Sequence, residues 1–173
     1  EPKGYIEVKE ATEALVTAVT DMSKTKTGAL IVLERAGRLR NQMTEGTKVD
    51  ALVSRELLCN IFVNRSPLHD GAVVISDGRI AAAGCFLPLT QKTSYPKEYG
   101  TRHRAAIGIT EVANVISLVV SEETGIISVA TEGRLIRDFT KDTLKDFLTA
   151  NLIEQNDDDS FIQKRQEKIK SVL

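Results

Sequence analysis

The sequence predicts an α/β fold in which a mixed central β-sheet of about six strands is flanked by helices. Segments with apolar residues at helical spacing alternate with short β-rich runs. Several of these runs are separated only by short turns, which predicts antiparallel hairpins and excludes a pure βαβ repeat. The 173 residues, of which 42% are hydrophobic and 27% charged, suffice for one domain with a buried core.

The first third of the chain predicts two helices and a strand. Apolar residues at helical spacing predict a helix over 8–24, and the apolar run 28–34 predicts a buried strand. The polar residues that follow, up to 48, predict an irregular link. Asp50 is a good N-cap, and apolar residues recur after it, so we expect the second helix to span 50–62.

The middle of the chain predicts a hairpin, a loop and a helix. Asp77-Gly78 lies between the β-rich runs 72–76 and 79–87, and this dipeptide is typical of tight hairpin turns. A loop over 89–100 leads to a helix over 101–113, with a threonine at its start that is able to cap it. The remaining predicted elements are strands at 114–121, 126–131 and 134–139 and a capped helix at 140–155.

We expect residues 1–155 to form the functional domain and residues 156–173 to be a flexible or short helical tail without a catalytic role. No apolar stretch approaches the roughly 18–20 residues that span a bilayer. The net charge of −1 provides no basic field for nucleic acid, and no nucleic-acid partner is expected. Cys59 and Cys85 lack metal-site spacing and predict buried thiols in a reducing cytosol.

The common nucleotide and hydrolase motifs are missing from the sequence. There is no phosphate-binding P-loop, and no glycine-rich dinucleotide fingerprint follows a strand. The zinc-protease motif HExxH and the nucleophile motif GxSxG are also absent.

His69 and Asp70 precede a β-rich run and are followed by the small residues Gly71 and Ala72. In one interpretation this is a turn in which Asp70 caps backbone amides. In the other, Asp70 holds a divalent metal or accepts a proton, and His69 gives a ring nitrogen to the same metal. The small residues would then allow a ligand to approach the backbone. The local sequence leaves both interpretations open.

A second polar cluster, Thr101 to Arg104, begins a predicted helix. Arg102, His103 and Arg104 are consecutive donors at a helix end whose dipole is already positive, which is unfavourable unless an anion binds there. Free amides, the Thr101 hydroxyl and the guanidinium groups could together bind a phosphate. The alternative is a solvated basic turn.

A third cluster follows the predicted strand 114–121. Glu122 and Glu123 suit a solvated turn, but one of these carboxylates together with Asp70 would suit Mg²⁺ or Mn²⁺. Phe86 and Leu87 could receive a nucleobase. These clusters together fit a metal-dependent nucleotidyl or phosphoryl transferase.

The stretches "LHDGAVVI", "GTRHRAAIGITE" and "VVSEETG" strongly resemble the diadenylate cyclase domain family. Its two signatures correspond to Asp70-Gly71-Ala72 and Arg102-His103-Arg104, and the resemblance covers roughly residues 8–155. It implies the condensation of two ATP into cyclic di-AMP and two pyrophosphates with Mn²⁺, Mg²⁺ or Co²⁺. It also implies a homodimer in which two ATP-binding domains face each other.

Carried over by position, the resemblance gives the first two clusters distinct roles. Asp70 would help a metal to activate the 3′-hydroxyl of ATP. Thr101, Arg102 and His103 would hold the phosphates, and Arg104 would support their loop.

The remaining roles that the resemblance implies concern the metal and the base. His69 and Glu123 would contact the metal. Adenine would lie near Phe86 and Leu87, where relatives often carry a tyrosine at position 86. Ser121 would touch a phosphate or the metal, and Gly71 would lie against the nucleotide.

The flanking sequence is most similar to the membrane-anchored form of the family. This implies a full-length protein at the cytoplasmic face of the membrane, of which this chain would be a soluble fragment. In relatives of this form, a membrane regulator protein and phosphoglucosamine mutase are partners. Two alternatives remain: a nucleotide sensor that has lost catalysis, and a different metal-dependent nucleotidyltransferase.

Overall fold

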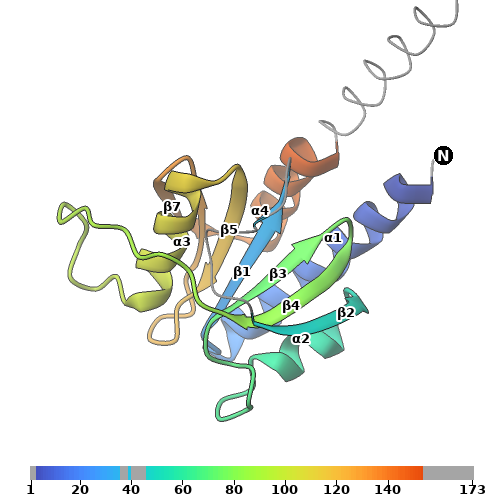
Figure 1. Ribbon diagram of the computed structural model, residues 1–173, viewed down its shortest axis with the longest axis horizontal. Coiled ribbons are helices and arrows are strands. Elements are labelled where there is room, and N and C mark those ends of the chain that lie inside the picture. The colour runs from blue at the N-terminus through green and yellow to red at the C-terminus, as the bar shows by residue number, and fades with distance from the viewer. Residues whose placement is uncertain (1–2, 36–38, 40–45, 154–173) are drawn as a thin grey trace, which may run out of the picture.

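A seven-stranded mixed sheet forms the centre of the protein, seen in a computed structural model that describes residues 3–35, 39 and 46–153 (Figure 1). The strand order is β2-β4-β3-β1-β5-β6-β7. Only β1 and β3 are parallel, and all other neighbours pair antiparallel. The strands are β1 (Ala29–Glu34), β2 (Thr47–Leu52), β3 (Ala72–Ser76), β4 (Arg79–Cys85), β5 (Val115–Val120), β6 (Ile127–Thr131) and β7 (Arg134–Phe139).

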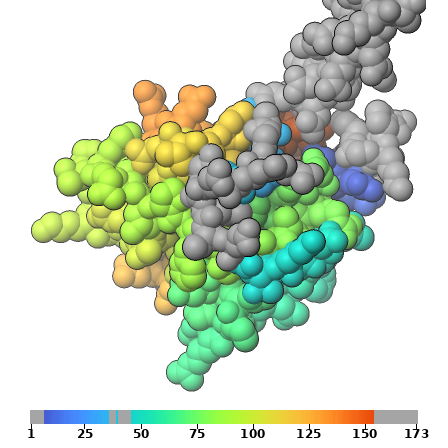
Figure 2. Space-filling model, viewed as in Figure 1, coloured from blue at the N-terminus to red at the C-terminus, as the bar shows by residue number. Residues whose placement is uncertain are grey.

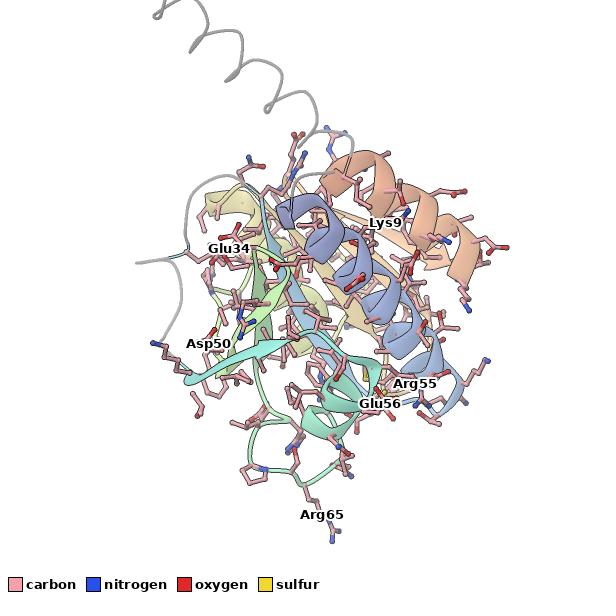
Figure 3. All side chains as sticks on the ribbon, turned by 90° about the vertical axis from the view of Figure 1, so that its right-hand side faces the viewer. Lys9, Glu34, Asp50, Arg55, Glu56 and Arg65 are labelled. Atoms are coloured by element: carbon pink, nitrogen blue, oxygen red, sulfur yellow. The ribbon has the colours of Figure 1, made fainter. Side chains whose placement is uncertain are left out.

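Helices cover both faces of this sheet because its central strands are apolar on both sides. In β1, Ile31 and Leu33 face one core, whereas Leu30 and Val32 face the other. The first core packs under α1 (Lys3–Lys24), α2 (Arg55–Ile61) and α4 (Lys141–Leu148), and Figure 3 views this helical face. The second core packs under α3 (Thr101–Val112).

Most of the predicted elements are confirmed. The helix predicted over 8–24 is α1, and the hairpin turn at Asp77-Gly78 joins β3 to β4. Both turn residues have positive φ, 51° and 76°, as a tight hairpin of this kind requires. The three C-terminal strands form at the predicted places.

The predicted start of the second helix was wrong. Residues 47–52 form β2, an edge strand that pairs with β4, and Asp50 lies inside it with a φ of 50°. The N-cap of α2 is Ser54, whose hydroxyl accepts a hydrogen bond from the Leu57 amide at 3.1 Å. Asp50 instead pairs with Arg79 of β4, with 3.0 Å between Oδ1 and Nε. Asp50 therefore belongs to the sheet rather than to the helix end.

Two other helix ends differ from the prediction. Thr101 is the first residue of α3, and the N-cap is Gly100, which makes no side-chain cap. The helix predicted over 140–155 is capped by Thr140 as expected, but beyond α4 it continues as a π-helix, η1 (Thr149–Ile153).

Some of the predictions lie outside the described residues. The tail at 156–173 is among them. In the part of the chain that is described, none of the helices has the length and apolarity that crossing a membrane requires.

Candidate active site

The sheet topology brings the three polar clusters to one edge. β1 runs parallel to β3 and antiparallel to β5, so the start of β3 and the end of β5 lie at the same end of the sheet. Asp70 and Gly71 directly precede β3, and Ser121 to Glu123 directly follow β5. The first turn of α3, which packs against β5, lies beside them. Segments about thirty and fifty residues apart in the sequence are therefore neighbours in space.

A pocket of about 460 Å³ opens between these segments. Ten of the residues singled out in the sequence line it: Asp70, Gly71, Phe86, Leu87, Thr101, Arg102, His103, Ser121, Glu122 and Glu123. Three others, His69, Ala72 and Arg104, are not among the lining residues. Its lining combines an apolar wall, formed by Phe86, Leu87 and Leu89, with carboxylate, hydroxyl, guanidinium and imidazole groups, a combination that suits a nucleotide.

Packing within the sheet requires small residues at Gly71 and Ala72. Gly71 has a φ of 92°, and a Cβ there would lie 2.8 Å from the carbonyl oxygen of Cys85. Ala72 is fully buried in the core beneath α3. The close packing of β4 against the start of β3 thus requires small residues here, and Gly71 also lines the pocket.

His69 turns away from the pocket lining toward its own loop. Its Nδ1 lies 2.6 Å from the carbonyl oxygen of Ser66, and its backbone amide donates to the same carbonyl. Asp70 and Glu123 are the two proposed metal contacts that line the pocket. Among the described residues, no three His, Cys, Asp or Glu side chains gather closely enough to hold a metal ion by themselves.

Arg102 is held in the pocket wall from two sides. Its Nη1 donates to Glu122 Oε2 at 2.9 Å. Its guanidinium lies against Gly28, the residue directly before β1, where a Cβ would be only 2.5 Å from Nη1. The guanidinium therefore occupies space that any larger residue at position 28 would take.

His103 is buried in the first turn of α3 and stacks on an aromatic ring. Its ring centroid lies 5.1 Å from that of Tyr99, with 18° between the ring planes. Burial lowers the pKa of His103 below its ordinary value, and the charges of Arg137 and Arg102 lower it further. His103 is consequently a neutral imidazole near pH 7, which can donate or accept a hydrogen bond but adds no positive charge.

Arg104 fastens the loop that leads into α3. Its Nε donates to the carbonyl oxygen of Tyr99 at 3.2 Å, and its own carbonyl accepts from the Thr90 amide at 3.0 Å. This contact with the loop fits the supporting role that the resemblance implies for Arg104.

The structure adds pocket residues that the sequence did not single out. Glu98 lines the pocket from the loop before α3, and Leu89 extends the apolar wall beside Phe86. The proximity of Glu98 to the basic cluster was a usable signal. No signal in the sequence indicated the contact of Gly28 with Arg102, because the two residues are 74 positions apart and only the fold brings them together.

A family model described as the DisA bacterial checkpoint controller nucleotide-binding domain, abbreviated DAC, matches residues 16–135. The chain belongs to the DAC family. The matched region contains every residue that lines the pocket.

Curated members of the DAC family with similar sequences carry cyclase names. The chain is 45% identical over 148 residues to the cyclic di-AMP synthase CdaA of Bacillus subtilis, covering 86% of this chain and 54% of that protein. It is 43% identical over 141 residues to a diadenylate cyclase of Listeria monocytogenes, covering 82% and 52% respectively. The chain thus spans about half the length of these relatives.

Solved structures of the family share the fold. A double cysteine mutant of DacA from Staphylococcus aureus matches with a TM-score of 0.79 and 41% identity, over 82% of this chain and 95% of that one. A hypothetical membrane-spanning protein from Bacillus cereus matches with a TM-score of 0.74 and 44% identity, over 76% and 64%. The predicted α/β class is confirmed, with seven strands rather than about six.

Proposed function

We propose that this chain is the catalytic domain of a diadenylate cyclase, which joins two ATP molecules into cyclic di-AMP and releases two pyrophosphates. The observation that carries the proposal is the single pocket lined by Asp70 of one signature motif and by Arg102 and His103 of the other. The names of the curated relatives support it.

The pocket offers a separate place for each part of ATP. The apolar wall at Phe86 and Leu87 suits the adenine ring, and Phe86 is 57% exposed, so its ring is accessible to a base. Thr101, Arg102 and Ser121 would hold the phosphates, because hydroxyl and guanidinium groups are strong donors to phosphate oxygens. His103 would add one neutral hydrogen bond.

Asp70 would perform the proton transfer. It would accept the proton of the ribose 3′-hydroxyl as the oxygen attacks the α-phosphorus of the other ATP, and pyrophosphate would leave from the opposite side. Arg102 would stabilise the charge that develops on the phosphate oxygens, and holding the two nucleotides in line would supply much of the acceleration.

A divalent cation, Mn²⁺, Mg²⁺ or Co²⁺, is part of the proposal. Asp70 and Glu123 present carboxylate oxygens to the pocket, and hard cations of this type are often bound by one or two carboxylates plus substrate phosphates. The residues present fit such an ion. When bound, the ion would lower the pKa of the attacking hydroxyl and neutralise phosphate charge. His69 would join it only after releasing the Ser66 carbonyl.

The reaction requires two copies of the domain. Closing a ring of two nucleotides needs two attacks, each of one 3′-hydroxyl on the other nucleotide, and the pocket contains a single Asp70. We therefore propose a homodimer in which two pockets face each other, with two-fold symmetry as the simplest arrangement.

The location and the other partners are also proposals. The similarity to CdaA and to a membrane-spanning protein supports a membrane-anchored full-length form. The membrane regulator and phosphoglucosamine mutase remain predicted partners, and the absence of a nucleic-acid partner remains a prediction.

Product identification tests the proposal. The protein is incubated with ATP and Mn²⁺, and the products are identified by mass spectrometry. Cyclic di-AMP is expected from the wild type and not from Asp70→Asn. The matched control is Asp77→Asn, which changes the other Asp-Gly pair, outside the pocket, and should retain activity.

Other outcomes separate the alternatives. ADP or AMP as the only product would reject the cyclase and favour another nucleotidyl or phosphoryl transferase. Binding of ATP without any product would favour the sensor. Specific activity should fall on dilution if a dimer is required, and constant specific activity at high dilution would contradict the dimer.

A further inference from the structure

We propose that Tyr99 is a positioning residue for the reaction, whose ring holds the His103 imidazole at the wall of the nucleotide pocket. The inference rests on the proposed function, because it concerns the same pocket. Tyr99 itself does not line that pocket, so it acts through His103.

The two rings form part of a three-ring stack. Tyr99 stacks on His103 with centroids 5.1 Å apart, and Tyr95 stacks on Tyr99 with centroids 5.8 Å apart and 28° between the planes. Tyr95 and Tyr99 belong to the loop between β4 and α3, which extends from the body of the protein in Figure 1. The stack therefore joins this loop to the first turn of α3.

Two hydrogen bonds and a cation–π contact fix Tyr99 in place. The Tyr99 amide donates to the Pro96 carbonyl at 3.1 Å, and Arg104 Nε donates to the Tyr99 carbonyl at 3.2 Å. The guanidinium of Arg137, on β7, lies over the Tyr99 ring at 5.6 Å from its centroid, a cation–π arrangement.

Tyr95 connects the stack to the turn between β6 and β7. Its hydroxyl donates to the carbonyl oxygen of Gly133, in the turn between β6 and β7, at 2.8 Å. The three rings thus span from the β6–β7 turn to the pocket, and the end of the stack that reaches the pocket is His103.

Among the described residues, Tyr99 is the aromatic ring that stacks on the imidazole, and this contact orients the ring. No hydrogen bond to either ring nitrogen of His103 is formed by a described residue, although its side chain is nearly buried. Stacking restricts the plane of the ring and leaves its one N–H to donate to a substrate phosphate. The charges that face this ring are those of Arg137 and Arg102.

Two substitutions at position 99 separate the ring from the hydroxyl. Tyr99→Phe keeps the aromatic face and should retain kcat/KM within about twofold, whereas Tyr99→Leu removes the face and should lower it about tenfold, the scale expected for a loosened substrate-contacting group. Tyr99→Met, a second non-aromatic variant, should behave like Tyr99→Leu and serves if that variant does not fold.

A spectroscopic measurement reports the stack directly. The chain has only two histidines, so the ring protons of His103 and His69 give two assignable sets of NMR signals. Loss of the Tyr99 ring current should shift the His103 signals in Tyr99→Leu and leave those of His69 unchanged. Tyr99→Phe should preserve the shifts of both.

Affinity for α,β-methylene ATP, which cannot lose pyrophosphate, is measured alongside activity. A folded Tyr99→Leu protein with wild-type kcat/KM and affinity would overturn the inference, as would equal losses in Tyr99→Phe and Tyr99→Leu. If the wild type makes no cyclic di-AMP, the proposed function fails. The inference is then decided by whether Tyr99→Leu binds the analogue more weakly than Tyr99→Phe.

Discussion

Gly28 and Arg102 are in direct contact: the guanidinium of Arg102 packs against the backbone of Gly28. A Cβ at position 28 would lie 2.5 Å from Nη1 and 2.6 Å from Cζ of Arg102. The same guanidinium donates to Glu122 at 2.9 Å, so the loops before β1 and after β5 hold one cation between them. The absence of a side chain at position 28 thus determines where the Arg102 guanidinium can lie.

Gly28→Ala should reduce nucleotide affinity without unfolding the protein. The overlapping atoms are the far end of a flexible side chain, so Arg102 can move aside, and we expect the free energy of unfolding to change by less than about 1 kcal/mol. Affinity for α,β-methylene ATP, measured by calorimetry, should fall about tenfold, since the displaced guanidinium loses a charge-assisted hydrogen bond.

A double-mutant cycle provides the control for Gly28→Ala. In an Arg102→Ala background the added methyl group has nothing to displace, so Gly28→Ala should cause no further loss of affinity. Additive losses in the two variants would show that Gly28 acts elsewhere than through Arg102.

Gly71→Ala should destabilise the fold more than it affects the pocket. The alanine would have to adopt a φ of 92° and place its Cβ 2.8 Å from the backbone oxygen of Cys85, which cannot move without disturbing β4. We expect a loss of about 2–4 kcal/mol in the free energy of unfolding, from backbone strain and overlap together. Urea denaturation measures it.

Gly84→Ala is the matched control for Gly71→Ala. Gly84 also has a positive φ, 66°, but the nearest atom to its Cβ would be 3.7 Å away. Strain alone should cost about 1 kcal/mol. Equal losses in the two variants would mean that the contact with Cys85 contributes nothing.

The buried His103 should make stability depend on pH. Its pKa is lower in the folded protein than the usual 6.5, chiefly because burial disfavours the charged ring. Below pH 6.5 the unfolded chain binds a proton that the folded protein does not, so stability is fully present above 6.5 and decreases as the pH falls toward the folded pKa. One such proton contributes at most about 1.4 kcal/mol per pH unit.

Urea unfolding between about pH 5.5 and 7.5 tests this dependence. His103→Gln should flatten the slope below pH 6.5, and His69→Gln should leave it as in the wild type. An unchanged slope in His103→Gln would assign the pH dependence to other groups.

The parts of the fold that the sequence predicted well are those with strong local signals. The buried runs at β1 and β5 and the turn at Asp77-Gly78 need no distant partner to be recognised. β2 was missed because it is an edge strand with no buried residue, and Asp50 interrupts it with a left-handed backbone. Its pairing with β4 is what makes it a strand.

In the candidate site too, local signals identified some residues, and the positions of others depend on the fold. Residue types and spacing identified most of the predicted residues that line one pocket, because charged and small residues at element ends are local signals, whereas Ser121 was singled out by the resemblance alone. The position of Gly28 beside Arg102 depends on packing between segments 74 residues apart, which spacing does not reveal. Tyr99 lies only four residues before His103, but the stacking of the two rings depends on how the loop enters α3. The pairing of β1 with β5 places Gly28, directly before β1, beside the loop after β5 whose Glu122 binds Arg102.

The corrected start of α2 leads to a prediction about stability. Ser54 accepts a hydrogen bond from the Leu57 amide, one of the amides at the helix start that have no partner within the helix. Ser54→Ala should therefore cost about 1 kcal/mol of unfolding free energy, the usual value for a lost N-cap.

Asp50→Asn provides the contrast, since Asp50 was the cap that the sequence favoured. Asparagine tolerates the left-handed backbone at this position and removes only an exposed ion pair with Arg79, so the loss should stay below about 0.5 kcal/mol. Figure 3 shows Asp50 on β2, well away from Arg55 and Glu56 at the start of α2. If denaturation found Asp50→Asn the more costly of the two, the helix would depend on Asp50 after all, and the assignment of Ser54 as its cap would be wrong.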